Sequence, residues 1–389
     1  MNSDATLLPF ILIFTTAAVL ATFALFTRQP LIVVYILVGI LLGPSVTGLI
    51  SEPTLIAGIA HIGIIFLLFL LGLDMQPAKL ANMFGRSLVV GLVSCSVFFA
   101  LGTGTSLLFG FDMTSAIIVG VAMMFSSTII GIKLLPTTVL HHRQTGELVV
   151  ALLLIQDLIA IVVLLVLTGN LWETGEFMQI AQVLITLPLL IGGAYLFVRF
   201  VLLKLLARFD AFHEYVFLLA IGWCMGFAEL AHRCGLSHEI GAFVAGVAIA
   251  TSPIALYIAD HLKPLRDFFL VLFFFSVGAG FDLALLPEVI VPALFLTAAV
   301  LIVKPVVFRL LLDGATRSPG RGWEIGFRLG QISEFSLLIA FLAVAEGLLG
   351  DNAAHLIQAT AILTFLFSSY LVVFRYQSPI AVDSRLRRD

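Results

Sequence analysis

Long apolar runs, separated by short charged or Gly/Pro-rich breaks, dominate this chain. The clearest run is Leu148 to Thr168, LVVALLLIQDLIAIVVLLVLT. A membrane-spanning helix needs about 20 such residues. Only 11% of the 389 residues are charged and 61% are hydrophobic, whereas a soluble domain carries about 25% charged residues. We therefore predict an all-α polytopic membrane protein.

Thirteen candidate spans follow from the runs between breaks. They cover residues 6–26, 30–50, 54–73, 87–109, 114–134, 147–169, 178–203, 215–232, 238–257, 266–282, 286–310, 323–346 and 353–375. Seventeen of the 20 basic residues then fall in loops on one side, and only Arg233 falls in the loops of the other side. By the positive-inside rule the basic side is cytoplasmic. This predicts a membrane domain at 1–376 with an outside N-terminus, and a cytoplasmic tail at 377–389.

The odd number of spans suggests two halves of opposite orientation. A first repeat at about 6–169, a linker helix at 178–203 and a second repeat at about 215–375 would form the inverted repeat found in many secondary transporters. In such proteins, interrupted helices at corresponding positions of the two halves mark the binding site. The fifth span of the first half and the fifth span of the second half form such a pair, because both are interrupted by small polar residues.

Both of these spans contain runs of small polar residues. The first has Ser126, Ser127 and Thr128, and the second has Gln331, Ser333 and Glu334. We predict that the backbone leaves the helix in both runs and faces an ion. The alternative is ordinary bonding of the hydroxyl groups to the preceding helical turn.

Charged residues inside the spans are the second sign of a site. A carboxylate in mid-membrane costs roughly 2.5–3.5 kcal/mol on insertion scales, so Asp157, beside Gln156, is a candidate proton or cation site. We expect Lys304 to face Asp157, because a buried ammonium needs a partner. The alternative is that Lys304 reaches the inner interface. Glu334 is interpreted as structural rather than ion-binding, offset by the end charges of half-helices.

Seven segments resemble one known group in both sequence and order. They are GILLGPSVTGLI, IGIIFLLFLLGLDM, FSSTIIGIKLL, GELVVALLLIQDLIAIVVLL, GLSHEIGAFVAGVAIATS, FFFSVGAGFDL and LGQISEFSLLIA. They resemble the monovalent cation:proton antiporter-2 family over roughly residues 7–375. The Gln-Asp pair is most similar to its Kef-type potassium/proton antiporter branch.

The resemblance implies a thirteen-helix sodium/proton-antiporter fold with two crossed broken helices. The ion-carrying core would be 87–169 with 286–375, and the dimerisation scaffold would be 6–73 with 215–282. Asp157 matches the family's ion- and proton-binding aspartate, and is thus the expected ligand of the transported metal cation. The other matched positions are Gln156 beside it, the unwound segments Ser126–Thr128 and Gln331–Glu334, and the basic residue Lys304.

The resemblance also implies the partners. These are a monovalent cation, the proton, membrane lipid and a second copy of the chain in a prokaryotic inner or plasma membrane, with no cofactor and no nucleic acid. Kef-type proteins usually continue into a cytoplasmic nucleotide-binding regulatory domain. No G-x-G-x-x-G fingerprint stands in this sequence. It is therefore either a shorter relative or part of a longer protein, and gating by a nucleotide or glutathione is not carried over.

We predict a secondary antiporter, not an enzyme, that exchanges K⁺ or Na⁺ for H⁺ by alternating access. The main alternative is an uncoupled, channel-like cation path, against which the lack of a TVGYG-type filter counts. An organic-anion transporter would be expected to carry an Arg in the core. An intramembrane protease would need a second mid-helix aspartate, which the spans lack. The sequence does not distinguish K⁺ from Na⁺, since oxygen atoms bind both.

Replacing Asp157 tests the predicted ion site. Asp157→Asn keeps the size of the side chain but removes its charge and its ability to exchange a proton. Cation-driven proton flux in proteoliposomes should be abolished while the variant still folds. Exchange at a near-normal rate in this variant would end the hypothesis.

Overall fold

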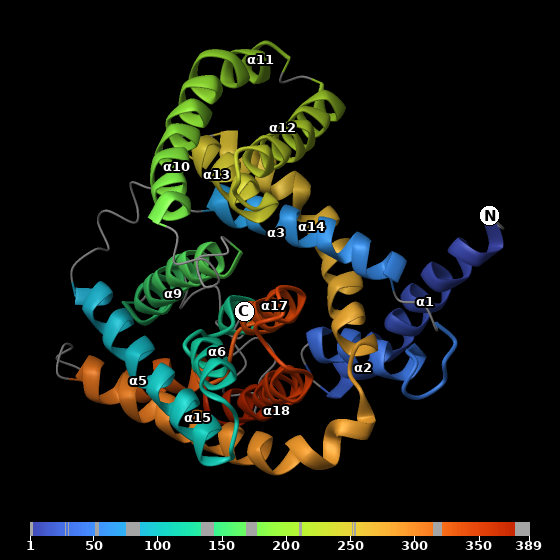
Figure 1. Ribbon diagram of the computed structural model, residues 1–389, viewed down its shortest axis with the longest axis vertical. Helices are drawn as coiled ribbons and strands as arrows, with labels where there is room; N and C mark the ends of the chain where they lie inside the picture. The colour runs from blue at the N-terminus through green and yellow to red at the C-terminus, as the bar shows by residue number, and fades with distance from the viewer. Residues whose placement is uncertain are drawn as a thin grey trace. The chain divides into compact units, whose positions relative to one another are not determined.

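The computed structural model describes residues 3–27, 29, 31–50, 54–74, 86–133, 144–168, 177–209, 212–250, 252, 254–313 and 321–377. Within these ranges the chain is helical and contains no β-strand (Figure 1). Its contacts divide it into two units. Unit 1 comprises Met1–Glu52, Met83–Ala160 and Val277–Asp389, and unit 2 comprises Pro53–Asn82 and Ile161–Ser276. The segment 6–73, expected as scaffold, is divided between the units, and the functional division into core and scaffold stays a prediction.

Unit 1 is built from helices near both ends and in the middle of the sequence. They are α1 (Ser3–Thr27), α2 (Leu31–Leu42), α5 (Arg86–Leu108), α6 (Met113–Met123), α7 (Thr128–Lys133), most of α9 (Gln144–Thr168), α15 (Leu286–Asp313), α16 (Arg321–Arg328), α17 (Glu334–Ala345) and α18 (Asp351–Arg375). A 3₁₀ turn at Leu283–Leu285 precedes α15.

Unit 2 contains the helices between them. They are α3 (Thr54–Asp74), α10 (Phe177–Phe197), a π-helical turn (Val198–Leu202), α11 (Leu203–Arg208), α12 (His213–Arg233), α13 (His238–Ala250) and nearly all of α14 (Ile254–Ala279). Each of the thirteen expected segments corresponds to one of these helices, or to consecutive helical pieces where the segment is interrupted or ends in the π-helical turn. By length and apolar composition, six described helices could cross a membrane, and six shorter apolar helices accompany them. The count of thirteen spans therefore stays a prediction.

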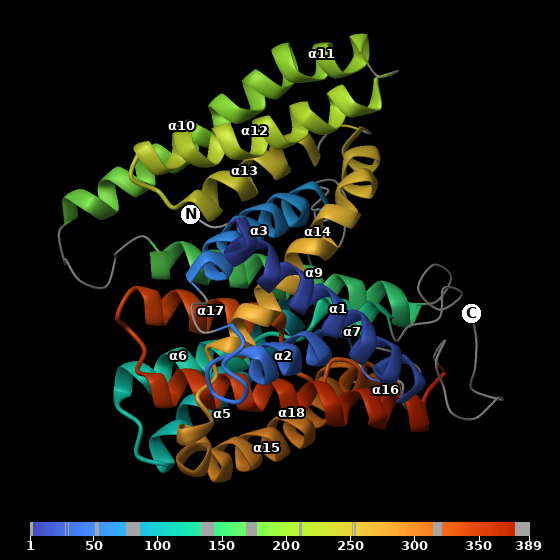
Figure 2. The same ribbon diagram turned by 90° about the vertical axis from the view of Figure 1, so that its right-hand side faces the viewer.

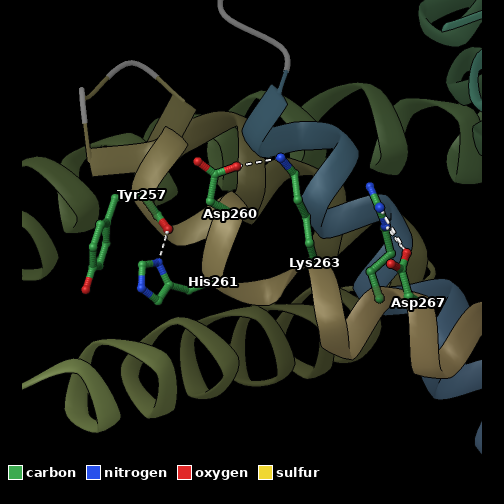
Figure 3. Close-up of polar contacts among 6 residues, drawn as sticks. Tyr257, Asp260, His261, Lys263 and Asp267 are labelled. Carbon is green, nitrogen blue, oxygen red and sulfur yellow. Dashed lines mark hydrogen bonds and ion pairs between the residues drawn. The ribbon is translucent and has the colours of Figure 1, made fainter. Parts of the chain in front are cut away.

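One expected break is wrong. The sequence predicted a loop around Lys263, but α14 begins at Ile254 and runs through this stretch. Figure 3 shows why the charges are compatible with a helix. The ammonium of Lys263 pairs with the Asp260 carboxylate one turn earlier. Arg266 Nη2 lies 2.9 Å from Oδ1 of the adjacent Asp267. A pair at a spacing of three or four residues, such as Asp260 and Lys263, stabilises a helix surface, so these charges do not end the helix.

The core of unit 1 holds the helix that carries Asp157. Helices α5, α6, α15 and α18 pack side by side (Figures 1 and 2), with α16 against α15. Between them lies a buried apolar cluster that joins α5, α9, α15 and α16. Its members are Val90, Phe98, Val149, Leu152, Leu153, Phe308, Leu312, Ile325 and Leu329. Three of them belong to α9, so this cluster fixes α9 against the helices of the later half.

In unit 2, two glycines allow α3 and α13 to approach closely. A Cβ atom on Gly246 would lie 2.1 Å from the carbonyl oxygen of Phe69, and one on Gly72 would lie 2.5 Å from that of Phe243. Small residues are what permit close backbone contact between membrane helices. The α3–α13 pair therefore depends on the absence of side chains at these positions.

Gly246→Ala should destabilise unit 2. The added methyl group collides with rigid backbone, and overpacking of this kind costs about 1–3 kcal/mol. The matched control is Gly226→Ala on α12, where a Cβ would meet nothing within 4 Å. Thermal unfolding in detergent should show a lower Tm for the first variant only. Equal Tm values for the two variants would contradict the close approach.

Candidate ion-binding site

Two helices of unit 1 are interrupted where the sequence places its small polar residues. One stops at Met123 and resumes as α7 at Thr128, and the other stops at Arg328 and resumes as α17 at Glu334. Ser126, Ser127 and Gln331 lie within the breaks and are fully buried. Non-helical backbone at membrane depth is tolerated only when protein or a water-filled cavity surrounds it. The burial of these residues meets that requirement.

Hydrogen bonds join the two breaks directly. Ser126 Oγ donates to the carbonyl oxygen of Leu329 at 2.8 Å, and Gln331 Nε2 donates to that of Ser127 at 3.5 Å. A third bond, from Ser336 Oγ to the carbonyl oxygen of Ala122, joins the flanking helices α17 and α6. The structure thus brings together the two polar runs that are about 200 residues apart in sequence.

Serine side chains also cap the half-helices that leave the breaks. Ser333 is the N-cap of α17, and its hydroxyl accepts the amide of Phe335 at 3.1 Å while Ser336 accepts the amide of Ser333 at 3.3 Å. In the other break, Ser127 Oγ accepts the amide of Ile130 at 3.1 Å. Capping satisfies amides that have no partner within the helix. These serines therefore stabilise the interruptions as fixed structures.

Lys304 on α15 reaches into the contact between the breaks. Its Nζ donates to the carbonyl oxygens of Phe125 at 2.7 Å and Gln331 at 3.1 Å, and to Ser126 Oγ at 3.2 Å. The ring of Phe98 lies 5.1 Å away. Carbonyls near the C-terminal ends of helices favour a cation. Lys304 is completely buried, so it does not reach an interface.

The expected direct pairing of Lys304 with Asp157 differs from this arrangement. Among the described residues, no ion pair joins the two side chains, because all three donors of the ammonium group are directed to the breaks. A buried ammonium is relieved by several carbonyl dipoles as well as by one carboxylate. The sequence predicted only the Asp157 carboxylate as a partner of Lys304.

Asp157 and Gln156 lie in the middle of α9 and both contact the first break. The Asp157 side chain is 2% exposed, and Thr128 Oγ1 lies 3.3 Å from each of its carboxylate oxygens. Gln156 Oε1 accepts the amide of Ser126 at 2.9 Å. The neighbouring residues therefore have different tasks. Gln156 holds the unwound backbone, and Asp157 presents a carboxylate beside a hydroxyl group.

Glu334 brings a second carboxylate near this site. It is the first residue of α17, is 6% exposed, and lies close enough to Asp157 for the two carboxylates to interact electrostatically. The positive end of the α17 dipole favours an acidic residue at this position. The structure thus gives the site two buried acidic groups and one buried ammonium.

Helix α18 contributes polar side chains to the second break that were not predicted from the sequence. Ser368 Oγ donates to Gln331 Oε1 at 2.7 Å, and Thr364 Oγ1 accepts the amide of Ile332 at 3.3 Å. With Thr360, these residues recur every four positions and are fully buried. A polar stripe of this period on an apolar helix is the signal that would have revealed them.

Two interrupted helices beside buried charges are typical of secondary transporters, and the comparisons with known proteins agree. Residues 11–374 match the family model described as "Sodium/hydrogen exchanger, transmembrane". The chain belongs to this family. The relatives named below support the Kef-type branch of the cation:proton antiporter-2 group, so the resemblance found in the sequence is confirmed.

Several curated proteins are similar to most of this chain. K(+) efflux antiporter 4 of Arabidopsis thaliana is 29% identical over 88% of this chain and 58% of its own length. The putative cation/proton antiporter YbaL of Escherichia coli is 28% identical over 87% and 62%. Iron transporter MagA of Paramagnetospirillum magneticum is 28% identical over 88% and 79%. The chain thus spans less than two thirds of the first two of these relatives.

A solved structure supports the fold. The sodium proton antiporter MjNhaP1 from Methanocaldococcus jannaschii superposes with a TM-score of 0.69 over 92% of this chain and 94% of that protein. The two sequences are 18% identical. The likeness confirms an all-helical antiporter-type fold.

Lys304→Met should destabilise the two breaks. The thioether fills much of the same space, but two buried carbonyls lose their ammonium donor, at about 1–3 kcal/mol for each unsatisfied group. We expect this loss to exceed the relief from no longer burying a charge. Lys263→Met, which removes an exposed ammonium from α14, is the control. A Tm for Lys304→Met equal to that of the control would refute the bridging role.

Proposed function

We propose that this protein is a secondary antiporter that exchanges a monovalent cation for H⁺, with Asp157 as the shared site. The observation that carries the proposal is the buried Asp157 carboxylate, which meets the Thr128 hydroxyl beside two interrupted helices. Burying a carboxylate in the membrane costs free energy. A membrane helix that carries one is therefore expected to use it to bind an ion or a proton. Antiport itself is supported by the family and by the names of the relatives.

The polar groups around Asp157 suit a cation. Carboxylate and hydroxyl oxygens are ligands for K⁺ and Na⁺, and the Lys304 ammonium is directed to the carbonyls of Phe125 and Gln331. The oxygens of Asp157 are therefore not occupied by a lysine. K⁺ is favoured over Na⁺ because the resemblance is to the Kef-type branch and two relatives in different groups of organisms are named as K⁺ or cation/proton antiporters.

Exchange follows from competition at one carboxylate. A protonated Asp157 has lost the charge that attracts the cation, and a bound cation opposes protonation. Alternating access would expose the carboxylate to the two sides in turn, with the two broken helices crossing at the site and moving with it. The proposed assignment extends to the assembly, the membrane and the orientation of the chain. It comprises a homodimer in a lipid bilayer, a prokaryotic inner membrane, an outside N-terminus and a cytoplasmic C-terminus.

Proton flux in proteoliposomes tests the proposal. K⁺, Na⁺, Rb⁺ and Li⁺ are added in turn while a dye reports the internal pH and the membrane potential is clamped. Each transported cation should drive protons in the opposite direction, and the cation concentration for half-maximal exchange should rise as pH falls, because protons compete for Asp157.

Asp112→Asn is the matched control, since it neutralises an exposed carboxylate at the N-cap of α6 and keeps a capping side chain. Its exchange should be unchanged. An uncoupled cation path would instead show cation flux with no opposing proton movement under the clamp, and this result would overturn the antiporter assignment.

A further inference from the structure

Arg328 is a fully buried arginine that the ion site itself does not use. It is the last residue of α16, directly before the break at 329–333, and its side chain is 0% exposed. Arginine is almost never fully buried unless it is paired. Its partners therefore show what the residue is for.

The Arg328 guanidinium joins α16 to the end of α18. Within α16, Nε and Nη2 donate to Glu324 Oε1 at 3.2 and 2.9 Å. The same Nη2 donates to the carbonyl oxygen of Gln377 at 2.7 Å, and the ring of Tyr376 lies 5.8 Å from the guanidinium carbon. The planar, multiply donating guanidinium can make these contacts at once. An arginine that only neutralised Glu324 would not also contact Tyr376 and Gln377, the two residues that follow α18.

From Arg328 the connection to the ion site is short. The next residue, Leu329, supplies the carbonyl that accepts Ser126 Oγ, and Gln331 supplies a carbonyl to Lys304. Ser126 in turn is held by Gln156, the neighbour of Asp157. A contiguous series of hydrogen bonds and adjacent residues thus runs from the end of α18 to the proposed ion site.

We propose that Arg328 is a positioning residue that couples the C-terminal end of α18, at Tyr376 and Gln377, to the geometry of the ion site. The coupling rests on the proposed function, because it is the antiporter site whose geometry it sets. Displacing Gln377, by a ligand or by polypeptide attached beyond it, shifts Arg328 and with it the carbonyls of the second break. The end of the last helix is then a place from which exchange is controlled.

Transport kinetics give the first test. Arg328→Gln should raise the KM of the cation by roughly two- to thirtyfold, the range found for mutations along coupling networks, with little change in kcat per folded protein. Arg328→Lys keeps the charge but not the planar guanidinium. Its KM for the cation should lie between that of the wild type and that of Arg328→Gln. The control Arg233→Gln removes an exposed arginine from the last turn of α12, where it pairs with Glu229 four residues earlier, and should match the wild type. A lower kcat with an unchanged KM would show a merely structural role and overturn the proposal.

Hydrogen exchange gives a test that does not depend on transport. In Arg328→Gln, amides of the first break at 124–128 should exchange faster than in Arg233→Gln, although they lie on another helix than Arg328. Tyr376→Ala should have the same effect in a smaller degree, and Tyr376→Phe should not. Unchanged exchange at 124–128 in both Arg328→Gln and Tyr376→Ala overturns the coupling whether or not the wild type transports. Failure of wild-type flux alone would count against the proposed function only.

Discussion

Unwound backbone inside a membrane protein must find hydrogen-bond partners within the protein, and the rest of this structure depends on that constraint. The two breaks meet it largely through each other. Ser126 bonds to Leu329 across the contact, and Lys304 bonds to a carbonyl of each break. A lysine is well suited to this task, because one ammonium group satisfies several acceptors from different segments. The breaks are thus parts of one hydrogen-bonded structure.

This arrangement determines which polar groups remain available to bind an ion. Gln156 holds the amide of Ser126, and the hydroxyl of Ser127 caps α7. The Asp157 carboxylate is not consumed by the Lys304 ammonium and has the Thr128 hydroxyl at 3.3 Å. The groups that hold the two breaks are thus different from the carboxylate and hydroxyl groups that we propose bind the ion.

Whether the sequence predicts a feature depends on how far apart along the chain the contacting residues lie. The breaks at Ser126 and Gln331 were predictable, because runs of small polar residues in apolar segments are a local signal. The partner of Lys304 was not, since the Phe125 and Gln331 carbonyls are backbone groups that have no signature in a sequence. The break expected between residues 257 and 266 is absent because the Asp260–Lys263 pair keeps these charges on the surface of α14. The role of Arg328 was not predictable, because its contact with the Gln377 carbonyl joins residues that are 49 positions apart in sequence.

We propose that Lys304 secures the breaks while Asp157 holds the transported cation. A cryo-EM or crystal structure at high pH in Rb⁺ or Tl⁺, both strong scatterers that substitute for K⁺, tests it most directly. We predict ion density next to the Asp157 carboxylate and the Thr128 hydroxyl, with Lys304 Nζ still donating to the carbonyl oxygens of Phe125 and Gln331. Ion density remote from Asp157, or Lys304 moved onto the Asp157 carboxylate with the ion among the carbonyls, would contradict it.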